Sequence, residues 1–202
     1  MSRPLVTTRL RDPLLLDVDD NELAREIANG QRESFTILYR RHVDRVFGLI
    51  TRILGPGHER EDLVQEIFHD LYRGLRSFRG DAKLSTYLYR IAVHTATDYL
   101  RGQRRHKTTS VSDEAWEALV NPETSPLDRA QKRQELVETF ELLATLKPKK
   151  RIAFVLAAVQ GLSLAEIGVI VGAEPDAVKQ RVLHARRELA QKLEHRQRRD
   201  PT

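Results

Sequence analysis

The chain contains no cysteine among its 202 residues, and only one methionine and one tryptophan. Without thiols it cannot form disulfides, zinc–thiolate centres or a cysteine nucleophile. Its seven histidines are scattered without an HExxH pair or comparable ligand spacing, and the sequence has neither a glycine-rich phosphate loop nor a GxSxG elbow. We therefore expect a protein that holds no metal and no cofactor and that is not an enzyme.

Long apolar runs are also missing. No stretch approaches the roughly 20 residues that are needed to span a bilayer. The short run 14–16 is followed at once by Asp17 and Asp19, which is unlike the apolar core of a signal peptide. We expect a cytoplasmic protein without membrane insertion.

Charge of both signs is abundant. The chain has 34 Lys and Arg against 29 Asp and Glu, a formal net charge of +5. This excess favours contact with a polyanion such as DNA, although it also suits solubility. With 40% hydrophobic residues, the chain can build one domain or two compact ones.

Nearly every periodic segment has helical spacing, and no strand-like alternation is found. A change of composition begins at Gly102, where a basic run is followed by Ser/Thr-rich and acidic sequence with two prolines, which is typical of a linker. The sequence thus predicts an all-α fold of two small helical domains joined by a flexible linker, the C-terminal one a helix-turn-helix. The expected segments are a disordered N-terminus (1–19), a first domain (20–106), an acidic linker (107–126), a second domain (127–195) and a tail (196–202). The expected helices cover about 21–29, 32–54, 59–75, a segment capped by Ser85 and Thr86 that runs through Leu100, then 127–146 and 149–160.

A helix-turn-helix is predicted near the C-terminus. Ser163 and Glu166 have the spacing of a capping box, which indicates a helix start. Gly172 can end this helix in the left-handed conformation, and Pro175 suits the first position of the next one.

The second helix of this motif has a packed side and a basic side. Such a helix is suited to enter a DNA major groove, although helix pairs with short turns also occur in proteins that never touch nucleic acid. The packed side comprises Val178, Val182, Ala185 and Leu189. The candidate DNA-binding residues are Lys179, Gln180, Arg181, Leu183, His184 and Arg187, with Arg181 and Arg187 expected on phosphates.

Two sets of motifs resemble bacterial extracytoplasmic-function (ECF) RNA polymerase sigma factors, in order and spacing, over about residues 20–195. Segments 61–68, 78–80, 84–92 and 98–101 are similar to the second domain of that family, and segments 162–167, 178–182 and 185–186 to the fourth. The resemblance implies a sigma factor that binds core RNA polymerase, directs initiation at promoter −10 and −35 elements and is held inactive by an anti-sigma factor. A stand-alone helix-turn-helix regulator is the alternative.

The resemblance implies two contacts with the polymerase. The helix that begins near Glu61 would dock on the clamp helices of the largest subunit, and the fourth domain on the flap of the second-largest subunit. The candidate docking residues point outward and are polar: Asp62, Gln65, Glu66 and His69. A merely solvated helix face is the other interpretation of this pattern.

The resemblance places −10 recognition on the following helix and its basic end. Arginines there would hold phosphates, and Tyr87 would either stack on an unpaired base or belong to the core. Tyr87 stands where the family usually has tryptophan, and His94 stands where it commonly has asparagine. The identity of the base recognised in the −10 element is therefore not predicted. The candidate residues are Tyr87, Arg90, His94, Asp98, Arg101, Arg104 and Arg105.

Overall fold

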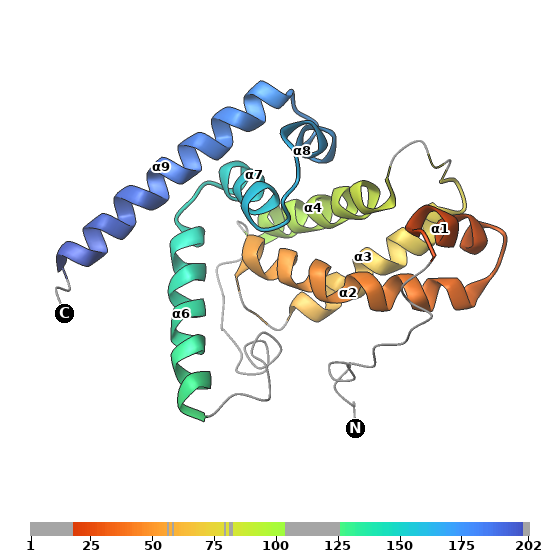
Figure 1. Cartoon of the computed structure of the whole chain (residues 1–202), viewed down its shortest axis with the longest axis horizontal. Coiled ribbons are helices and arrows are strands. Elements are labelled where there is room, and N and C mark those ends of the chain that lie inside the picture. Colours follow the sequence, from red (N-terminus) through yellow and green to blue (C-terminus); the bar gives the residue numbers. More distant parts are fainter. Residues whose placement is uncertain are drawn as a thin grey trace.

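The computed structural model describes residues 18–55, 57, 59–78, 80, 83–103 and 126–199. These residues form eight helices and no strand, as the periodicity predicts (Figure 1). The predicted linker lies almost entirely outside the described residues, and so does Trp116.

The first domain is a bundle of four helices. They are α1 (Asp20–Ala28), α2 (Arg32–Leu54), α3 (Glu59–Leu75) and α4 (Leu84–Gln103). Every pair of these helices is in contact. The buried stripes of α2, α3 and α4 meet at fully buried residues such as Leu38, Ile67 and Leu88, because apolar residues three and four positions apart share one helix face.

The second domain packs around one long helix. Its helices are α6 (Pro126–Ala144), α7 (Pro148–Ala158), α8 (Leu164–Val171) and α9 (Pro175–Arg199). Helix α9 lies against α6, α7 and α8. Its predicted packed side is confirmed, since Val178, Val182, Ala185 and Leu189 are all buried.

The predicted bounds of α2 and α3 are those of the structure. Most of the N-terminal segment that was expected to be disordered, residues 1–17, lies outside the described residues, and at its end the carboxylate of Asp19 caps α1 by accepting from the Asn21 amide at 3.1 Å. Helix α6 begins at Pro126, inside the predicted linker. Helix α9 continues to Arg199, beyond the predicted domain end, and Arg196 donates to Glu141 at 2.9 Å.

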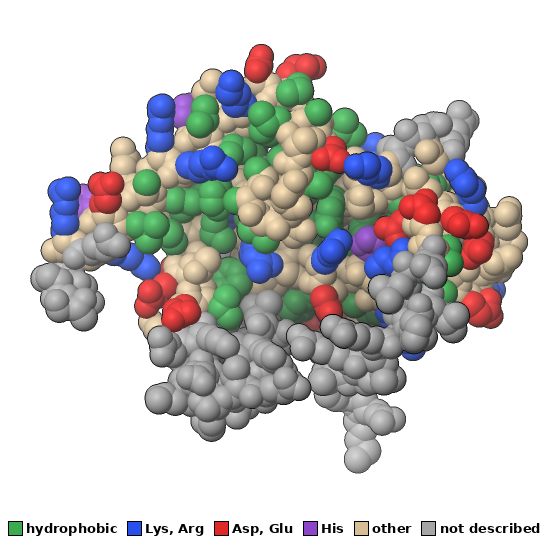
Figure 2. Space-filling view, in the orientation of Figure 1, with side chains coloured by type: hydrophobic (Ala, Val, Ile, Leu, Met, Phe, Trp, Pro, Cys, Tyr) green, Lys and Arg blue, Asp and Glu red, His purple; other side chains and the backbone are tan. Residues whose placement is uncertain are grey.

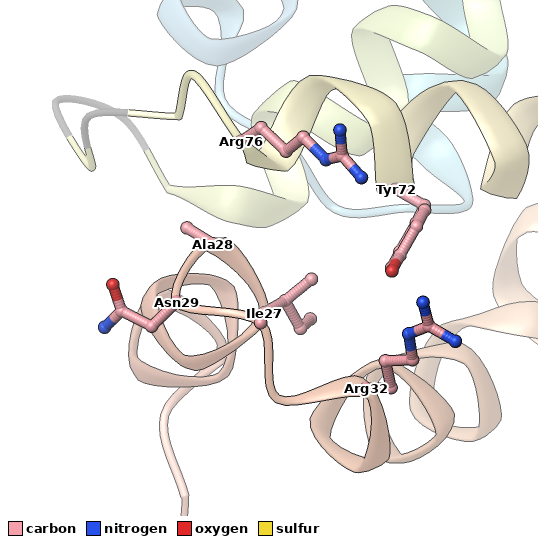
Figure 3. A pocket seen from close by; sticks show the side chains of 7 residues that line it. Ile27, Ala28, Asn29, Arg32, Tyr72 and Arg76 are labelled. Atoms are coloured by element: carbon pink, nitrogen blue, oxygen red, sulfur yellow. The ribbon is translucent and has the colours of Figure 1, made fainter.

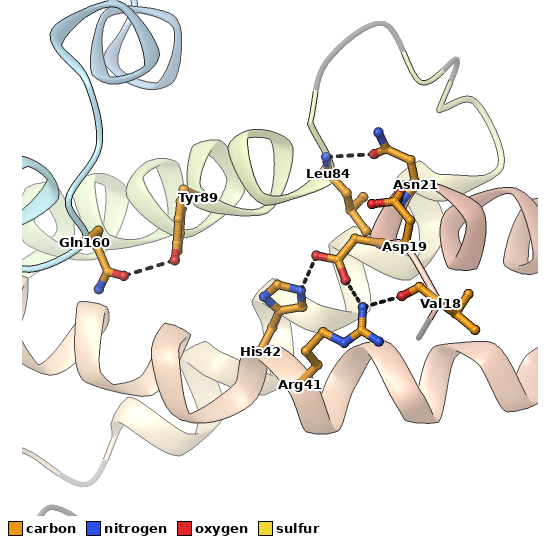
Figure 4. Close-up of polar contacts among 9 residues, drawn as sticks. Val18, Asp19, Asn21, Arg41, His42, Leu84, Tyr89 and Gln160 are labelled. Carbon is orange, nitrogen blue, oxygen red and sulfur yellow. Dashed lines mark hydrogen bonds and ion pairs between the residues drawn. The ribbon is translucent and has the colours of Figure 1, made fainter. Parts of the chain in front are cut away.

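The cap of α4 also differs from the sequence prediction. Ser85 and Thr86 do not precede this helix but lie within its first turn, which begins at Leu84. The Leu84 amide donates instead to the side-chain oxygen of Asn21, in α1, at 3.0 Å (Figure 4). A free amide at a helix start needs an acceptor, and here a neighbouring helix supplies it.

The two domains pack against each other. Helix α4 contacts α8, and α2 contacts both α6 and α7. The Tyr89 hydroxyl donates to the Gln160 side chain at 3.0 Å, and the Lys83 ammonium pairs with Glu166 at 3.2 Å. The sequence does not predict this contact between the domains.

A buried arginine lies at the centre of this contact. Arg151, in α7, is 8% exposed. Its guanidinium donates across the domain boundary to the carbonyl of Ile53 at 2.7 Å, and within its own domain to the carbonyls of Ala144 (2.8 Å) and Leu146 (3.2 Å). Burial lowers the pKa of Arg151. The three carbonyls accept from its two terminal nitrogens and offset the cost of burying the charge, whereas its Nε has no hydrogen-bond partner among the described residues.

Replacing this arginine should weaken the fold and the domain contact together. Arg151→Met leaves three carbonyls without a donor, so we expect the free energy of unfolding to fall by about 2–3 kcal/mol. Urea denaturation measures this change, and the radius of gyration from solution X-ray scattering should rise as the domains separate. Lys149→Met, an exposed change on the same helix, is the matched control. Equal stability of the two variants would contradict this role of Arg151.

Candidate nucleic-acid interface

The turn between α8 and α9 has the predicted geometry. The Ser163 hydroxyl accepts from the Glu166 amide at 3.3 Å, and the Glu166 carboxylate accepts from the Ser163 amide at 3.0 Å, which completes the capping box. Gly172 ends α8 at φ 61°, in the left-handed region. Gly168 is also required, because a Cβ there would lie 2.6 Å from the Ala173 carbonyl oxygen. These features determine the direction of α9 relative to α8.

The outer side of α9 is exposed and carries most of the predicted DNA-binding residues. Lys179, Gln180, Leu183, His184 and Arg187 are exposed, whereas Arg181 is half-buried. Figure 2 shows Lys and Arg side chains spread along this helix. A basic helix with a packed back and a free outer side has the shape and charge that a major groove accepts.

Glu166 joins the helix-turn-helix to the first domain. Hydrogen bonds from the Ser163 amide and hydroxyl, together with the bond from Lys83, lower the pKa of Glu166 to about 2. Lys83 immediately precedes α4, so this ion pair connects the start of the proposed −10 helix to the start of α8.

Tyr87 is half-buried, in agreement with both interpretations that the sequence leaves open. Its hydroxyl would lie 2.0 Å from a Cβ at Gly74, so any larger residue at that position of α3 would require the Tyr87 side chain to move. The Phe78 ring is 5.6 Å away, and the Arg90 guanidinium lies 5.3 Å from the Tyr87 ring centroid. A base that stacked on the face covered by Arg90 would displace this cation–π contact.

Tyr89 belongs to the core, since it is 5% exposed and bonded to Gln160. Further along α4, Asp98 accepts from Arg101 at 2.9 Å and lies 3.1 Å from the Nδ1 atom of His94. All three side chains are exposed. A phosphate that binds Arg101 must therefore compete with a carboxylate of the same helix. Arg104 and Arg105 lie outside the described residues.

The outer side of α3 is polar along its length. Asp62, Gln65, Glu66 and His69 are exposed, while the apolar stripe of the same helix faces the core. The structure thus presents the four predicted docking residues on one accessible surface, away from α2 and α4.

A polar cluster between α1 and α2 was not found from the sequence. Asp20 accepts from Arg41 at 2.5 Å and lies 2.8 Å from the Nε2 atom of His42, which is 4% exposed (Figure 4). Burial alone would raise the pKa of Asp20, but the hydrogen bonds and charges of His42 and Arg41 outweigh it and lower the pKa. The cluster holds α1 in place, and with it Asn21, which caps α4.

Comparisons with known proteins identify the family of this chain. Residues 38–106 match the model for Sigma-70 region 2, and residues 136–189 match that for Sigma-70, region 4. The chain is 34% identical over 185 residues to the ECF RNA polymerase sigma-E factor of Escherichia coli K12, covering 87% of this chain and 94% of that protein. The chain belongs to the ECF family of RNA polymerase sigma factors. It is therefore an alternative sigma factor that acts in transcription initiation, and a stand-alone regulator would not account for region 2.

Other relatives extend the comparison. The RNA polymerase sigma-H factor of Pseudomonas aeruginosa is 31% identical over 90% of this sigma factor and 97% of its own length. Two solved structures share the fold: CnrH in complex with the cytosolic domain of CnrY, and the sigma factor RpoE in complex with the anti-sigma factor NepR from Bartonella quintana. The first has a TM-score of 0.67 and 24% identity, covering 87% of this chain and 97% of that one. The second has a TM-score of 0.65 and 20% identity, covering 80% and 98%.

Within the described part of the chain, no helix is long and apolar enough to cross a membrane. The same residues include no group of three or more His, Asp or Glu side chains that could hold a metal ion.

The depressed pKa of Glu166 predicts a pH dependence. Because the folded state holds its charged form, Glu166 adds stability above its ordinary pKa of 4.5, and this stability is lost as the pH falls toward about 2. Wild type should therefore lose more stability over this interval than Glu166→Gln, as urea denaturation at a series of pH values would measure. Glu174→Gln, an exposed change just before α9, should keep the wild-type dependence. Parallel curves for wild type and Glu166→Gln would show that the capping box does not control this dependence.

Proposed function

We propose that this sigma factor binds core RNA polymerase through the outer side of α3, reads the −10 element with α4 and reads the −35 element with the outer side of α9. It acts in the cytoplasm and has no catalytic step of its own. The observation that carries the proposal is the pair of exposed polar surfaces, one acidic on α3 and one basic on α9, each backed by a buried apolar stripe.

The α3 surface is proposed to meet the clamp helices of the largest subunit. Asp62 and Glu66 are one helical turn apart and have no ion-pair partner among the described residues, so both carboxylates are free to pair with basic side chains. The second domain is proposed to meet the flap of the second-largest subunit. Holding both domains on one polymerase would let two weak DNA contacts act together, since the second becomes intramolecular.

On the α9 surface, some residues are proposed to contact bases and others to contact phosphates. Lys179, Gln180 and His184 lie opposite the packed side and would reach base edges. Arg181 and Arg187 would hold phosphates, which set affinity without reading sequence. On α4, the arginines would bind phosphates beside Tyr87 in the same way.

Control by an anti-sigma factor is proposed from the relatives of the same fold. RpoE was solved with the anti-sigma factor NepR, and CnrH with the cytosolic domain of CnrY. In the present chain, α4 and α8 already lie against each other. A partner that held the two domains in this arrangement would keep them from reaching two separate promoter elements.

Charge reversal on α3 tests docking. The double variant Asp62→Lys/Glu66→Lys should bind core polymerase at least tenfold more weakly, because two carboxylates are replaced by like charges. Fluorescence anisotropy of the labelled sigma factor titrated with core polymerase measures the affinity.

The matched control reverses two exposed carboxylates elsewhere, Asp44→Lys/Glu194→Lys, and should change this affinity less than threefold. Circular dichroism should give the same helix content for both variants. Equal affinities of the two variants would mean that the α3 surface is only solvated.

Substitutions on α9 test promoter reading. Gln180→Ala should change which base is preferred at one −35 position, at a cost of about 1–3 kcal/mol for the original base. Arg187→Ala should lower activity evenly across sequences and flatten the salt dependence, since a lost phosphate contact carries no sequence information. Transcription from a panel of −35 variants at several salt concentrations measures both effects.

Gln191→Ala supplies a control with the same chemical change at a position that is likewise exposed, about two helical turns beyond His184, the last of the proposed base-contacting residues. It should leave the base preference unchanged. If the preference also stays unchanged in Gln180→Ala, Lys179→Ala and His184→Ala, α9 does not read the −35 sequence.

A further inference from the structure

A pocket of about 440 Å³ lies in the first domain, away from α9. It is formed where α1 ends, α2 begins and α3 ends, and its lining includes Arg32, Tyr72 and Arg76 (Figure 3). In Figure 3 the Tyr72 hydroxyl and the Arg32 guanidinium point toward each other across the opening, and Arg76 approaches from the α3 side. Neither the docking surface nor the proposed DNA-reading residues include this pocket.

The pocket is positively charged. Two guanidiniums line it and no carboxylate does. Neither the Arg32 nor the Arg76 side chain forms a hydrogen bond or ion pair with another described residue, in contrast to the side chains of Arg101 and Lys83. Arg32 is also the first residue of α2, whose N-cap residue makes no side-chain hydrogen bond, so the positive end of this helix lies at the same place. The opening is therefore suited to an anion.

The rest of the lining is apolar or aromatic. Ile27 and Ala28 supply aliphatic surface. The Tyr72 ring is held by an edge-on contact with Phe35, at 4.9 Å between centroids. Its hydroxyl has no partner among the described residues. A volume of this size fits a ligand much larger than a phosphate ion, and an aromatic wall beside two guanidiniums suits a ligand with a planar ring and a phosphate.

We propose that this pocket binds one nucleotide, with its phosphate held by Arg32 and Arg76 and its base against Tyr72 and Ile27. The nucleotide we assign is one of a single DNA strand, an assignment that rests on the proposed function. The pocket is lined by Arg76, two residues before Phe78, and the Phe78 ring contacts Tyr87 of the proposed −10 surface at 5.6 Å between centroids, so the end of α3 links the two places. A strand that leaves the −10 surface can continue into it.

The test measures binding of a short fluorescein-labelled single-stranded DNA to the full chain, without polymerase. Arg32→Gln/Arg76→Gln should weaken this binding about tenfold and lower the slope of log affinity against log salt by roughly 0.7 for each lost phosphate contact. The control Arg40→Gln/Arg73→Gln removes the same charge from exposed positions outside the lining. It should weaken binding less than threefold.

Competition measurements show whether the pocket binds a nucleotide or only phosphate, and whether that nucleotide belongs to a DNA strand or is free. Deoxynucleoside monophosphate should displace the oligonucleotide at far lower concentration than inorganic phosphate. If Arg32→Gln/Arg76→Gln still binds the oligonucleotide but no longer binds the monophosphate, the pocket is a nucleotide site whose ligand is a free nucleotide.

Two results would overturn the proposal: equal losses in the pocket and control variants, or competition by inorganic phosphate as strong as by the nucleotide. A failure of the function proposed above would appear separately. Such a protein would not bind core polymerase, whereas the oligonucleotide measurement needs no polymerase.

Discussion

The architecture depends on the C-terminal end of α2, where the chain leaves a row of backbone carbonyls without helical partners. Two buried guanidiniums bind there. Arg60, which is 1% exposed, donates to Gly55 at 2.6 Å and lies 5.2 Å from the Tyr99 ring centroid, while Arg151 of the second domain donates to Ile53 at 2.7 Å. Since the last carbonyls of a helix carry partial negative charge, one helix end can attract a cation from each domain.

This contact decides which surfaces are free. With the second domain seated on α2 and α4, the Tyr89 hydroxyl and the Lys83 ammonium are engaged by the second domain. The outer sides of α3 and α9 remain exposed. The chain in this arrangement can therefore present its proposed polymerase-docking surface and its proposed −35 surface, while part of the α4 region faces its own second domain.

Charge on the molecule is divided between paired and unpaired cations. Arg101 is paired with Asp98 and Lys83 with Glu166, so a phosphate must displace a carboxylate to reach them. Arg32 and Arg76 at the pocket have no such carboxylate among the described residues. The net charge of the chain does not reveal this difference, because it counts every arginine equally, whether or not a carboxylate lies beside it in the fold. We expect the affinity of each surface for DNA to depend on its number of unpaired Lys and Arg side chains and not on its total number of Lys and Arg.

The local features could be predicted from the order of the residues alone: the bounds of α2 and α3, the capping box at Ser163, the left-handed Gly172 and the two sides of α9. Each depends on residues within one or two helical turns, so periodicity and capping chemistry are sufficient. The cap of α4 by Asn21, the pocket at the end of α3 and the packing of the second domain on the first depend instead on how the helices come together in the folded chain. The partners there are far apart in the chain, 98 residues for Arg151 and Ile53. Such pairs leave no periodic signal, because their proximity follows from how whole helices pack and not from the spacing of residues along any one of them.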